Sequence, residues 1–373
     1  MASPDTMAGE SEIVSTRKDQ HLDVVAKKDV AFGGLALGFD RFTLEYDALP
    51  EIDLDEVDLG TTLLGKKLAA PLVIGAMTGG SPRAGRVNER LARVAAKVGV
   101  GLALGSQRAM IVDPSLASTF DVKVHAPDIP LVFGNVGAVQ LNYGVDVEAV
   151  REAIARVSAD ALNVHLNPLQ EAVQPEGDTR FGSLAPKIDQ LARAIGVPVV
   201  VKECGAGLSR RTLRKLAPLA IAGVEVAGVG GTSWSKVESH RAPEGSAQQT
   251  IGMRLGGHGV PTVDATVLAR DAMRERVVIA SGGVRTGMDV AIALALGADA
   301  VALAAPLLIA AEESEAKAEA FLRTLVQELR VILFTCGLRN LVELSRATVI
   351  AASDDPLVTA REAHVAGRIQ RGW

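Results

Sequence analysis

The stretch PLVIGAMTGG, residues 71–80, has the pattern that decides the fold: a short apolar run that ends in Thr and Gly. The segment that follows, RVNERLARVAAKVG (86–99), places Val87, Leu91 and Val94 on one stripe at helical spacing. Together the two segments predict one β-strand followed by one amphipathic helix.

The same pattern occurs eight times along the chain. The strand candidates are continuously apolar instead of alternating, which is typical of strands buried on both faces. Eight β-then-α units of this kind predict an α/β fold, a closed (β/α)8 TIM barrel with a parallel sheet. The strand candidates are residues 71–80, 100–108, 130–137, 161–167, 198–205, 224–232, 277–284 and 300–308.

The rest of the chain is organised around this barrel. Residues 1–16 are small, polar and acidic without periodicity, so we expect a disordered lead-in. We expect residues 17–373 to form a single domain. Its parts are an N-terminal arm over 17–70, the barrel over about 71–310, and C-terminal helices over 316–373, the first from Ala316 to Gly337.

Composition restricts the class of function. A chain of 373 residues that is 48% hydrophobic can bury a large core. A net charge of -5 argues against general affinity for nucleic acid or an acidic membrane, so an anionic ligand must be small. Two cysteines suit a reducing compartment, and the sequence has neither a signal-peptide core nor a long apolar span. We expect a soluble cytoplasmic protein.

Two glycine-rich loops predict a phosphate site. GVGGTSW (228–234) and SGGVRTG (281–287) follow the sixth and seventh strand candidates, so they lie side by side in the predicted barrel. Glycines allow backbone N–H groups to approach phosphate oxygens, and Thr232 and Arg285 add a hydroxyl and a positive charge. A single such loop is more often a turn, but two neighbouring ones favour a phosphorylated ligand.

A charged residue inside a strand indicates a cofactor. Lys202 lies in an otherwise apolar strand, where an unpaired charge would be costly. It pairs with Glu203 or another carboxylate of the barrel, or its ammonium faces the mouth and contacts a cofactor. Met77, Thr78 and Asn135 would surround the same ligand. A flat heterocycle with one phosphate, such as FMN, satisfies these features together.

Several motifs carry a resemblance to a known family. They are RKDQH (17–21), MTGG (77–80), GSQR (105–108), HLNPLQE (165–171), PEGD (175–178), VKECGAGLS (201–209), GGTSW (230–234) and SGGVR (281–285). Over nearly its whole length the sequence resembles type 2 isopentenyl diphosphate isomerase, the flavin-dependent form of that enzyme. The resemblance implies a small-molecule diphosphate substrate, reduced FMN, Mg²⁺, NADPH as reductant, and a homo-oligomer, a tetramer or an octamer.

The resemblance and the loop positions give an expected flavin site. Glu225 stands where the family usually has Asp, and Ala227 where Ser is commoner. Ala304 and Ala305 replace the usual Ala-Gly. The expected flavin contacts are Ala76, Met77, Thr78, Ser106, Asn135, Lys202, Ala227, Thr232, Gly282, Gly283, Val284, Arg285, Ala304 and Ala305.

HLNPLQE supplies the substrate groups that the resemblance implies. Glu171 would hold Mg²⁺, a hard cation that bridges carboxylate and diphosphate oxygens. His165 and Asn167 alternate on one face of the strand end, so both can donate hydrogen bonds to the diphosphate. Gln170 would lie nearest the hydrocarbon, where it binds the substrate and takes part in catalysis. The alternative for His165 and Asn167 is a hydrogen-bonded brace of the loop.

Residues distant in sequence complete the expected site. The i, i+1, i+4 spacing of Arg17, Lys18 and His21 would let the N-terminal arm fold over the diphosphate, with Arg108 as a third cation. Glu238 would join Gln170 and His165 in the catalytic set; a surface glutamate is the alternative. The Gly- and Gln-rich segment 240–261 is either a lid or disordered.

Three other functions fit parts of the pattern. An FMN oxidoreductase acting on a 2-hydroxy acid would need a His base after a late strand, which SGGVRTG does not offer. A non-catalytic flavin protein would not need the intact set of His165, Asn167, Gln170 and Glu171. An aldolase would use Lys202 as a Schiff-base amine.

Overall fold

Eight parallel strands close into the predicted barrel. The computed structural model describes residues 4–31 and 37–351, with side chains from Thr16 onward. The strand order around the barrel is β10-β11-β4-β5-β6-β7-β8-β9, so neighbours in sequence are neighbours in space. The strands are β4 (Leu72–Ile74), β5 (Gly101–Ala103), β6 (Val132–Gly137), β7 (Ala161–Leu166), β8 (Val199–Glu203), β9 (Gly223–Glu225), β10 (Val277–Ser281) and β11 (Ala300–Leu303).

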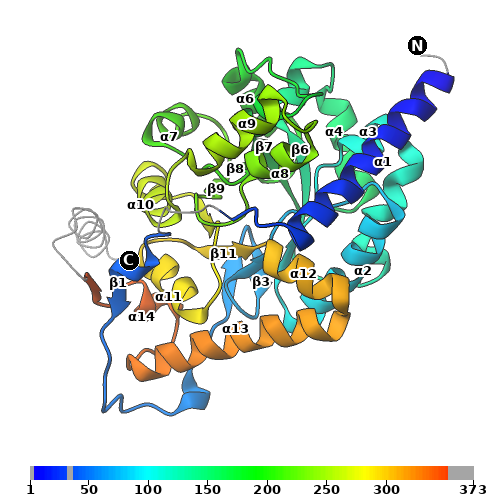
Figure 1. Cartoon of the computed structure of the whole chain (residues 1–373). Coiled ribbons are helices and arrows are strands. Elements are labelled where there is room, and N and C mark those ends of the chain that lie inside the picture. The colour runs from blue at the N-terminus through cyan, green and yellow to red at the C-terminus, as the bar shows by residue number, and fades with distance from the viewer. Residues whose placement is uncertain (1–3, 32–36, 352–373) are drawn as a thin grey trace.

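Each predicted strand overlaps one observed strand, and helices surround the barrel (Figure 1). The last candidate was predicted too long, because Ala305 already begins a helix after Leu303. Helices α2 to α7 are Pro82–Val98, Arg108–Val112, Val147–Arg156, Pro168–Val173, Leu184–Ala194 and Arg210–Leu216. Helices α8 to α14 are Trp234–Arg241, Ala247–Arg254, Thr262–Ala272, Gly287–Ala295, Ala305–Glu313, Glu315–Thr335 and Leu341–Leu344.

Local sequence determines where these helices begin and end. Ser81 caps α2 by accepting a hydrogen bond from Ala84 N (3.2 Å), and Pro82 occupies the first turn. Gly99 ends the helix with a φ of 74°, a conformation that glycine adopts without strain. The buried stripe of α2 then packs against the barrel and α13.

A hairpin closes the lower end of the barrel. Strands β2 (Thr61–Leu63) and β3 (Lys66–Leu68) pair antiparallel, with Leu64 and Gly65 in the turn. Leu63 and Leu68 are buried in the cluster that fills the barrel interior, together with Phe133, Val200 and Ile279. The interior is therefore packed below the mouth, and an open space remains at the carboxyl ends of the strands.

The N-terminal segment differs from the prediction of a disordered lead-in over residues 1–16. Helix α1 runs from Pro4 to Lys27, so residues 4–16 belong to its first turns. The segment contains several strong helix formers and no proline after Pro4, which the first turn of a helix tolerates. We predicted disorder because the segment has no apolar stripe at helical spacing. A segment without such a stripe can still form a helix.

The C-terminal region is not composed of helices alone, as the sequence had suggested. The predicted helix from Ala316 to Gly337 corresponds to α13, and the short α14 follows. Val349–Ala351 then form β12, which pairs with β1 (Phe42–Leu44) of the N-terminal arm. β-branched Val349 and Ile350 favour a strand once an edge is available. The tail after Ser353 lies outside the described residues.

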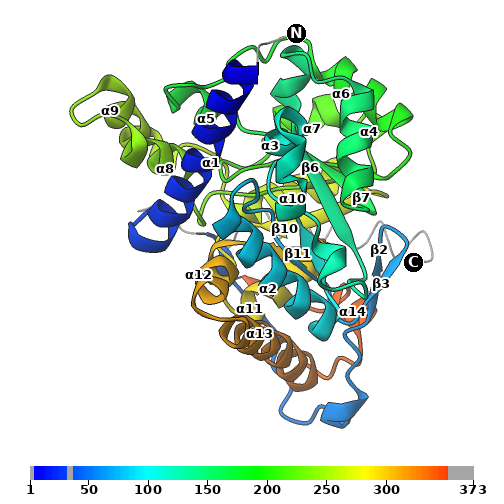
Figure 2. The same ribbon diagram turned by 90° about the vertical axis from the view of Figure 1, so that its right-hand side faces the viewer.

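The segment 240–261, predicted as a lid or as disordered, contains an ordered helix. Ser246 caps α9, and Ser239 of α8 donates to Gln249 O (2.6 Å), which joins the two helices. In Figure 2, α8 and α9 extend from one side of the molecule next to α1. Across the described residues, the structure shows no helix suited to spanning a membrane.

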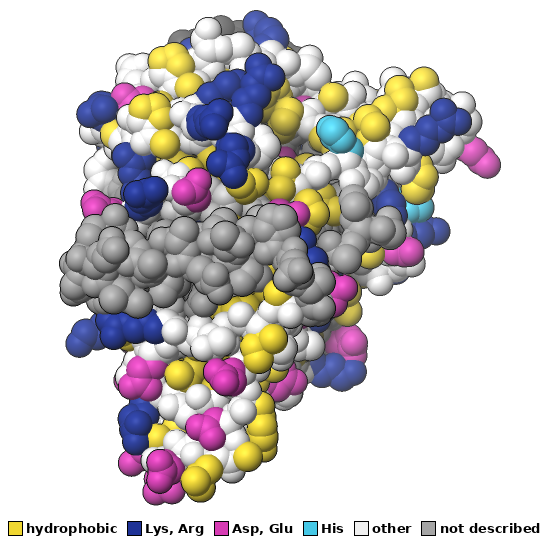
Figure 3. Space-filling model, turned by 90° about the vertical axis from the view of Figure 1, so that its left-hand side faces the viewer, with side chains coloured by type: hydrophobic (Ala, Val, Ile, Leu, Met, Phe, Trp, Pro, Cys, Tyr) yellow, Lys and Arg dark blue, Asp and Glu magenta, His cyan; other side chains and the backbone are white. Residues whose placement is uncertain are grey.

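Charged side chains on the outer wall lie apart from the barrel mouth. Arg210, Arg211, Arg214 and Lys215 of α7 are exposed. On the face in Figure 3, Lys and Arg side chains gather in the upper half. None of these four α7 residues lines the pocket at the mouth, so they do not belong to the candidate site.

Candidate active site

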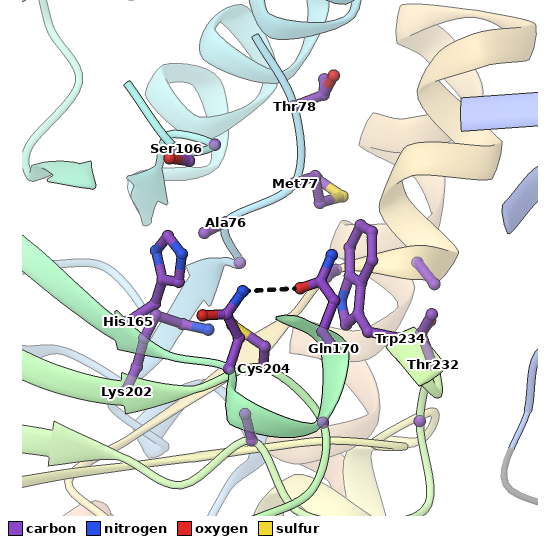
Figure 4. A pocket seen from close by; sticks show the side chains of 18 of the residues that line it. Ala76, Met77, Thr78, Ser106, His165, Gln170, Lys202, Cys204, Thr232 and Trp234 are labelled. Carbon is purple, nitrogen blue, oxygen red and sulfur yellow. Dashed lines mark hydrogen bonds between the residues drawn. The ribbon is translucent and has the colours of Figure 1, made fainter. Parts of the chain in front are cut away.

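A large pocket (Figure 4) opens at the carboxyl ends of the barrel strands, and Arg17, Lys18 and His21 of α1 line part of it. It encloses about 1580 Å³ of space, including open solvent at its mouth. All the residues predicted for flavin, substrate or metal binding line it. The exception among the predicted site residues is Glu238, which is fully buried behind the pocket wall.

Strand periodicity explains why polar residues meet here. Phe133, Val200 and Ile279 belong to the cluster that fills the barrel interior. Side chains two residues further along a strand point to the same face, so Asn135, Lys202 and Ser281 face inward one layer higher. On β7, His165 follows Asn163 in the same way, and both are largely buried. In the view of Figure 4, His165 and Lys202 lie to the left and Gln170 and Trp234 to the right.

We call the side built from α1, the β7–α5 turn and α8 the polar half. Pro168 begins α5 immediately after β7 and brings Gln170 and Glu171 to the mouth. Asn167 Nδ2 donates to Gln170 Oε1 (3.1 Å) and to Glu171 Oε1 (2.9 Å). The polar half comprises Arg17, Lys18, His21, His165, Asn167, Gln170, Glu171 and Glu238.

Glu238 connects the helices of the polar half. Its Oε1 accepts from Gln170 Nε2 (2.8 Å) and from His21 Nε2 (3.0 Å), and Arg241 donates to Oε2. Burial alone would raise the pKa of Glu238, but His21, Arg241 and Gln170 outweigh it and lower this pKa to about 2. Glu238 is therefore an ionised acceptor at neutral pH.

The three basic residues of α1 lie where the sequence predicted. Burial lowers the pKa of His21, so the ring is neutral and its Nε2–H donates to Glu238. Burial and the neighbouring Arg17 lower the pKa of Lys18 to about 8. With its amide nitrogen toward Glu238 (3.2 Å), Gln174 accepts from Arg17 Nη1 (3.2 Å). These contacts attach α1 to α5 and α8 over the mouth.

His165 is held in one tautomer, which sets a condition on its predicted hydrogen bond to the diphosphate. Asn135 Nδ2 donates to Leu104 O (2.9 Å), so Asn135 Oδ1 faces His165 Nδ1 (2.9 Å). The oxygen therefore accepts a hydrogen bond from Nδ1–H. Burial, Lys202 and Lys18 lower the pKa of His165 to about 3. The neutral ring therefore has an unprotonated Nε2, and it can donate to a diphosphate from that atom only after taking up a proton.

The opposite side, which we call the glycine half, is formed by residues 228–232, 282–285 and 304–305. A Cβ added to Gly231 would lie 2.7 Å from Gly283 N, and one added to Gly282 would lie 2.2 Å from Gly228 O. The two loops thus touch through their backbones, as the predicted strand order required. Gly283 has a φ of 76° and Ala227 a φ of 40°, which is strained for a residue with a side chain.

Lys202 forms its ion pair with another carboxylate of the barrel, Glu225, and contacts the backbone of Glu203. Its Nζ donates to Glu203 O (2.6 Å) and lies 3.6 Å from Glu225 Oε1. The Glu203 carboxylate accepts from the backbone N–H groups of residues 204–207, so it shapes the loop after β8. Lys202 also lines the pocket, so the ion pair and the ligand-facing position coexist.

Two buried oxygen atoms in the pocket wall lack partners. Among the described residues, Thr78 Oγ1 and Asn167 Oδ1 make no hydrogen bond. Buried polar atoms are normally satisfied, so these two fit a polar ligand. Thr78 lies at the expected flavin contacts and Asn167 at the expected substrate contacts. Together with the close-packed glycine loops, they make the pocket suitable for FMN and a second, polar ligand.

Glu171 is the only carboxylate of the HLNPLQE turn that reaches the pocket. Its Oε2 accepts from Asp178 N (2.8 Å), and burial raises its pKa. In the described part of the chain, no group of three or more His, Cys, Asp or Glu gathers to hold a metal. Glu171 fits Mg²⁺ only as one of several ligands, with substrate oxygens and water completing the shell.

The structure adds residues to which the sequence analysis gave no role. Trp234 lines the pocket and meets the His21 ring edge to face, with 5.1 Å between ring centroids. Its place in the GGTSW motif could have indicated this. Gln174, one helical turn beyond Gln170, and Gln140 and Cys204 also line the pocket. Arg108 Nη1 donates to Asp178 (2.6 Å), the last residue of the PEGD motif. The motif therefore holds Arg108, which was predicted to bind the diphosphate.

Comparison with known proteins gives consistent matches. The model of the FMN-dependent dehydrogenase family matches residues 172–351. An isopentenyl-diphosphate delta-isomerase of Synechocystis sp. is 44% identical over 88% of this chain and 94% of its own length. One from Deinococcus radiodurans is 45% identical over 89% of this chain and 96% of its own length.

Solved structures share the fold at much lower identity. A mandelate oxidase mutant with an FMN adduct superposes with a TM-score of 0.61 at 15% identity, covering 92% of this chain and 100% of that one. A putative lactate oxidase of Pediococcus acidilactici gives 0.61 at 15% identity, covering 95% and 96%. At this identity the likeness concerns the barrel alone.

Proposed function

Because this chain belongs to the family of FMN-dependent isopentenyl-diphosphate delta-isomerases, we propose that it interconverts isopentenyl and dimethylallyl diphosphate. One observation carries the assignment of this activity to the pocket. The basic groups of α1, the glycine half, and Gln170, whose amide donates to the buried Glu238, all face a single cavity. The activity is an allylic proton shift that belongs to the biosynthesis of isoprenoids.

The substrate's diphosphate would bind in the polar half. Arg17 and Lys18 of this half and Arg108 of α3 line the pocket, and charge-assisted hydrogen bonds from them favour an anion. Asn167 Oδ1 accepts hydrogen bonds only, so it suits a metal-bound water instead of a bare phosphate oxygen. Glu171 would hold Mg²⁺, which neutralises part of the diphosphate charge. His165 would donate to the anion once protonated.

The flavin would bind between Lys202 and the glycine half. Backbone N–H groups of residues 282–284 would hold its phosphate, and Thr78 Oγ1 supplies an unpaired hydroxyl at the ring. When bound, reduced FMN supplies the acid and base for the allylic proton shift. We propose NADPH as the usual reductant, which the reaction does not consume in stoichiometric amounts.

Gln170 and Glu238 would position the reacting groups. Gln170 is fixed at both ends, because Nε2 donates to Glu238 while Oε1 accepts from Asn167. Glu238 is ionised and buried, so it can stabilise positive charge that develops near Gln170. Met77, Leu22 and Trp234 add apolar surface to the pocket, which helps to exclude water from the hydrocarbon.

Two further properties belong to this proposal. We propose a homo-oligomer, a tetramer or octamer, on the basis of the sequence resemblance. We also propose a cytoplasmic location, which the free Cys204 and Cys336 support. The aldolase alternative is not favoured, because Glu225 helps to raise the pKa of Lys202 despite burial and a Schiff base needs a neutral amine.

An anaerobic assay tests the proposed activity. The protein is mixed with FMN, its visible spectrum is recorded, and isopentenyl diphosphate and Mg²⁺ are added with and without dithionite or NADPH. Dimethylallyl diphosphate should form only with reduced flavin, and chelation by EDTA should stop it. FMN binding without isomerisation would retain the cofactor and reject the activity. Absence of FMN binding would reject both.

A further inference from the structure

We propose that Glu225 is a positioning residue that holds the Lys202 ammonium in the pocket, with Ser281 fixing the Glu225 carboxylate. The inference rests on the proposed FMN site and adds two residues to it. In the sequence, Glu225 differs from the family's usual Asp, and Ser281 belongs to the SGGVRTG loop without a predicted contact.

Strand register brings the three residues together. Lys202 of β8 is the direct Cα partner of Glu225 on β9, and Glu225 is the partner of Ile279 on β10. Ser281 lies two residues after Ile279, on the same face of its strand. All three side chains therefore project inward at the layer that forms the pocket floor, and all three line the pocket.

The contacts form a short chain. Glu225 Oε1 lies 3.6 Å from Lys202 Nζ and accepts a hydrogen bond from Ser281 Oγ (2.9 Å). Ser281 Oγ in turn accepts from Ala227 N (3.0 Å), where the backbone has a left-handed φ of 40°. The Glu225 carboxylate is thus tied to the strained turn that begins the glycine half.

The ion pair is too long for a good hydrogen bond, and this leaves Lys202 free to bind a ligand. An ammonium has three N–H donors. Within the described residues, Lys202 donates a hydrogen bond to Glu203 O. Glu225 therefore supplies charge without occupying the remaining donors. Side-chain exposures of 7% for Lys202 and 6% for Glu225 mean that neither charge can rely on water.

Loss of the carboxylate should remove the ammonium from the pocket. Without Glu225, the buried Lys202 would lose its proton or turn toward another partner, because an unpaired buried charge is costly. The largest effect that raises the pKa of Lys202 against burial is the charge of Glu225. Glu225→Gln should therefore resemble Lys202→Met in its effect on flavin binding.

A double-mutant cycle on FMN affinity tests this inference. The dissociation constant of FMN is measured for the wild type, E225Q, K202M and the double variant, with the thermal midpoint of each apoprotein. We expect each single change to weaken FMN binding roughly tenfold, and the double variant to match K202M within about twofold. Additive losses would show that Glu225 does not act through Lys202.

The flavin reduction potential gives a second readout that does not depend on K202M binding FMN. Measured at saturating FMN, E225Q should shift the potential from the wild-type value, and the conservative E225D should restore most of it. An unchanged potential in E225Q would overturn the inference, even if the variant is less stable. A wild-type protein that does not bind FMN would instead overturn the proposed function on which the inference rests.

Discussion

In the polar half of the pocket, charged and amide side chains bind one another across three helices, whereas in the glycine half two loops touch through their backbones. Glu238 joins α8 to α5 and α1, and its partner His21 is 217 residues away in sequence. Gly231 and Gly283 instead meet because β9 and β10 are adjacent strands. Substitutions in the two halves should therefore have separable effects on chemistry and on cofactor binding.

Gln170→Ala should damage chemistry in the polar half and leave the glycine half intact. We expect turnover to fall roughly a thousandfold, because the reacting groups would lose their positioning, with FMN affinity unchanged. Turnover is measured in quenched assays at saturating FMN, and FMN affinity is measured by a flavin titration. Gln248→Ala, on the exposed surface of α9, is the matched control and should be neutral. Normal turnover in Q170A would remove Gln170 from the mechanism.

Glu238→Gln should loosen the contacts among the helices of the polar half. The pKa of Glu238 is lowered to about 2 from 4.5, so its ionisation stabilises the folded protein above pH 4.5. This stabilisation, about 3 kcal/mol, should shrink as the pH falls from 4.5 toward 2.

Urea unfolding at pH 7, 4.5 and 3.5 measures this difference between the wild type and E238Q. The gap in unfolding free energy should be constant between pH 7 and 5 and narrow below 4.5. Glu244→Gln, an exposed carboxylate just after α8, provides the control. A gap that does not change with pH would mean that the Glu238 charge contributes nothing to stability.

Gly283→Ala should affect the glycine half alone. The φ of 76° is unfavourable for alanine, and its Cβ would lie 2.4 Å from Gly230 O. We expect FMN to bind about 30-fold more weakly, equivalent to about 2 kcal/mol of strain and displacement. Gly196→Ala has a similar φ of 84° but open space around the Cβ, so it should retain FMN. Equal losses in both variants would assign the effect to general destabilisation.

Lys18→Arg should change how substrate binding in the polar half depends on pH. The pKa of Lys18 is lowered to about 8 by burial, so above pH 8 the ligand-free protein must take up a proton to bind an anion. Diphosphate affinity should then fall by up to about tenfold per pH unit. Calorimetry with isopentenyl diphosphate and oxidised FMN from pH 7 to 9 should show this slope in the wild type. K18R should abolish it, while Lys28→Arg on the exposed surface should retain it.

The difference between the halves also explains what the sequence could predict. Eight apolar runs with glycine-bearing ends were enough for the barrel, its strand order and the adjacent glycine loops, because these follow from local pattern and chain order. The Glu238 contacts with His21 and Gln170 could be suspected only through family motifs. Nothing local connects residues so far apart in sequence.

Other features depended on tertiary contacts that no local pattern contains. The tautomer of His165 follows from the Asn135 hydrogen bond to Leu104 O, a contact between neighbouring strands. Strand β12 forms because β1 offers an edge, so a helical prediction for that region was wrong. The helix over residues 4–16 was missed because the prediction relied on an apolar stripe.

The distance in sequence between His21 and Glu238 has a consequence for synthesis of the chain. Helix α1 leaves the ribosome first, but the carboxylate that anchors it is made 217 residues later. His21 of α1 therefore lacks this partner until α8 has emerged, when six of the eight barrel strands, β4 to β9, have been made and β10 and β11 still follow. Helix α1 is thus translated before the other described elements, but its contact with Glu238 forms late.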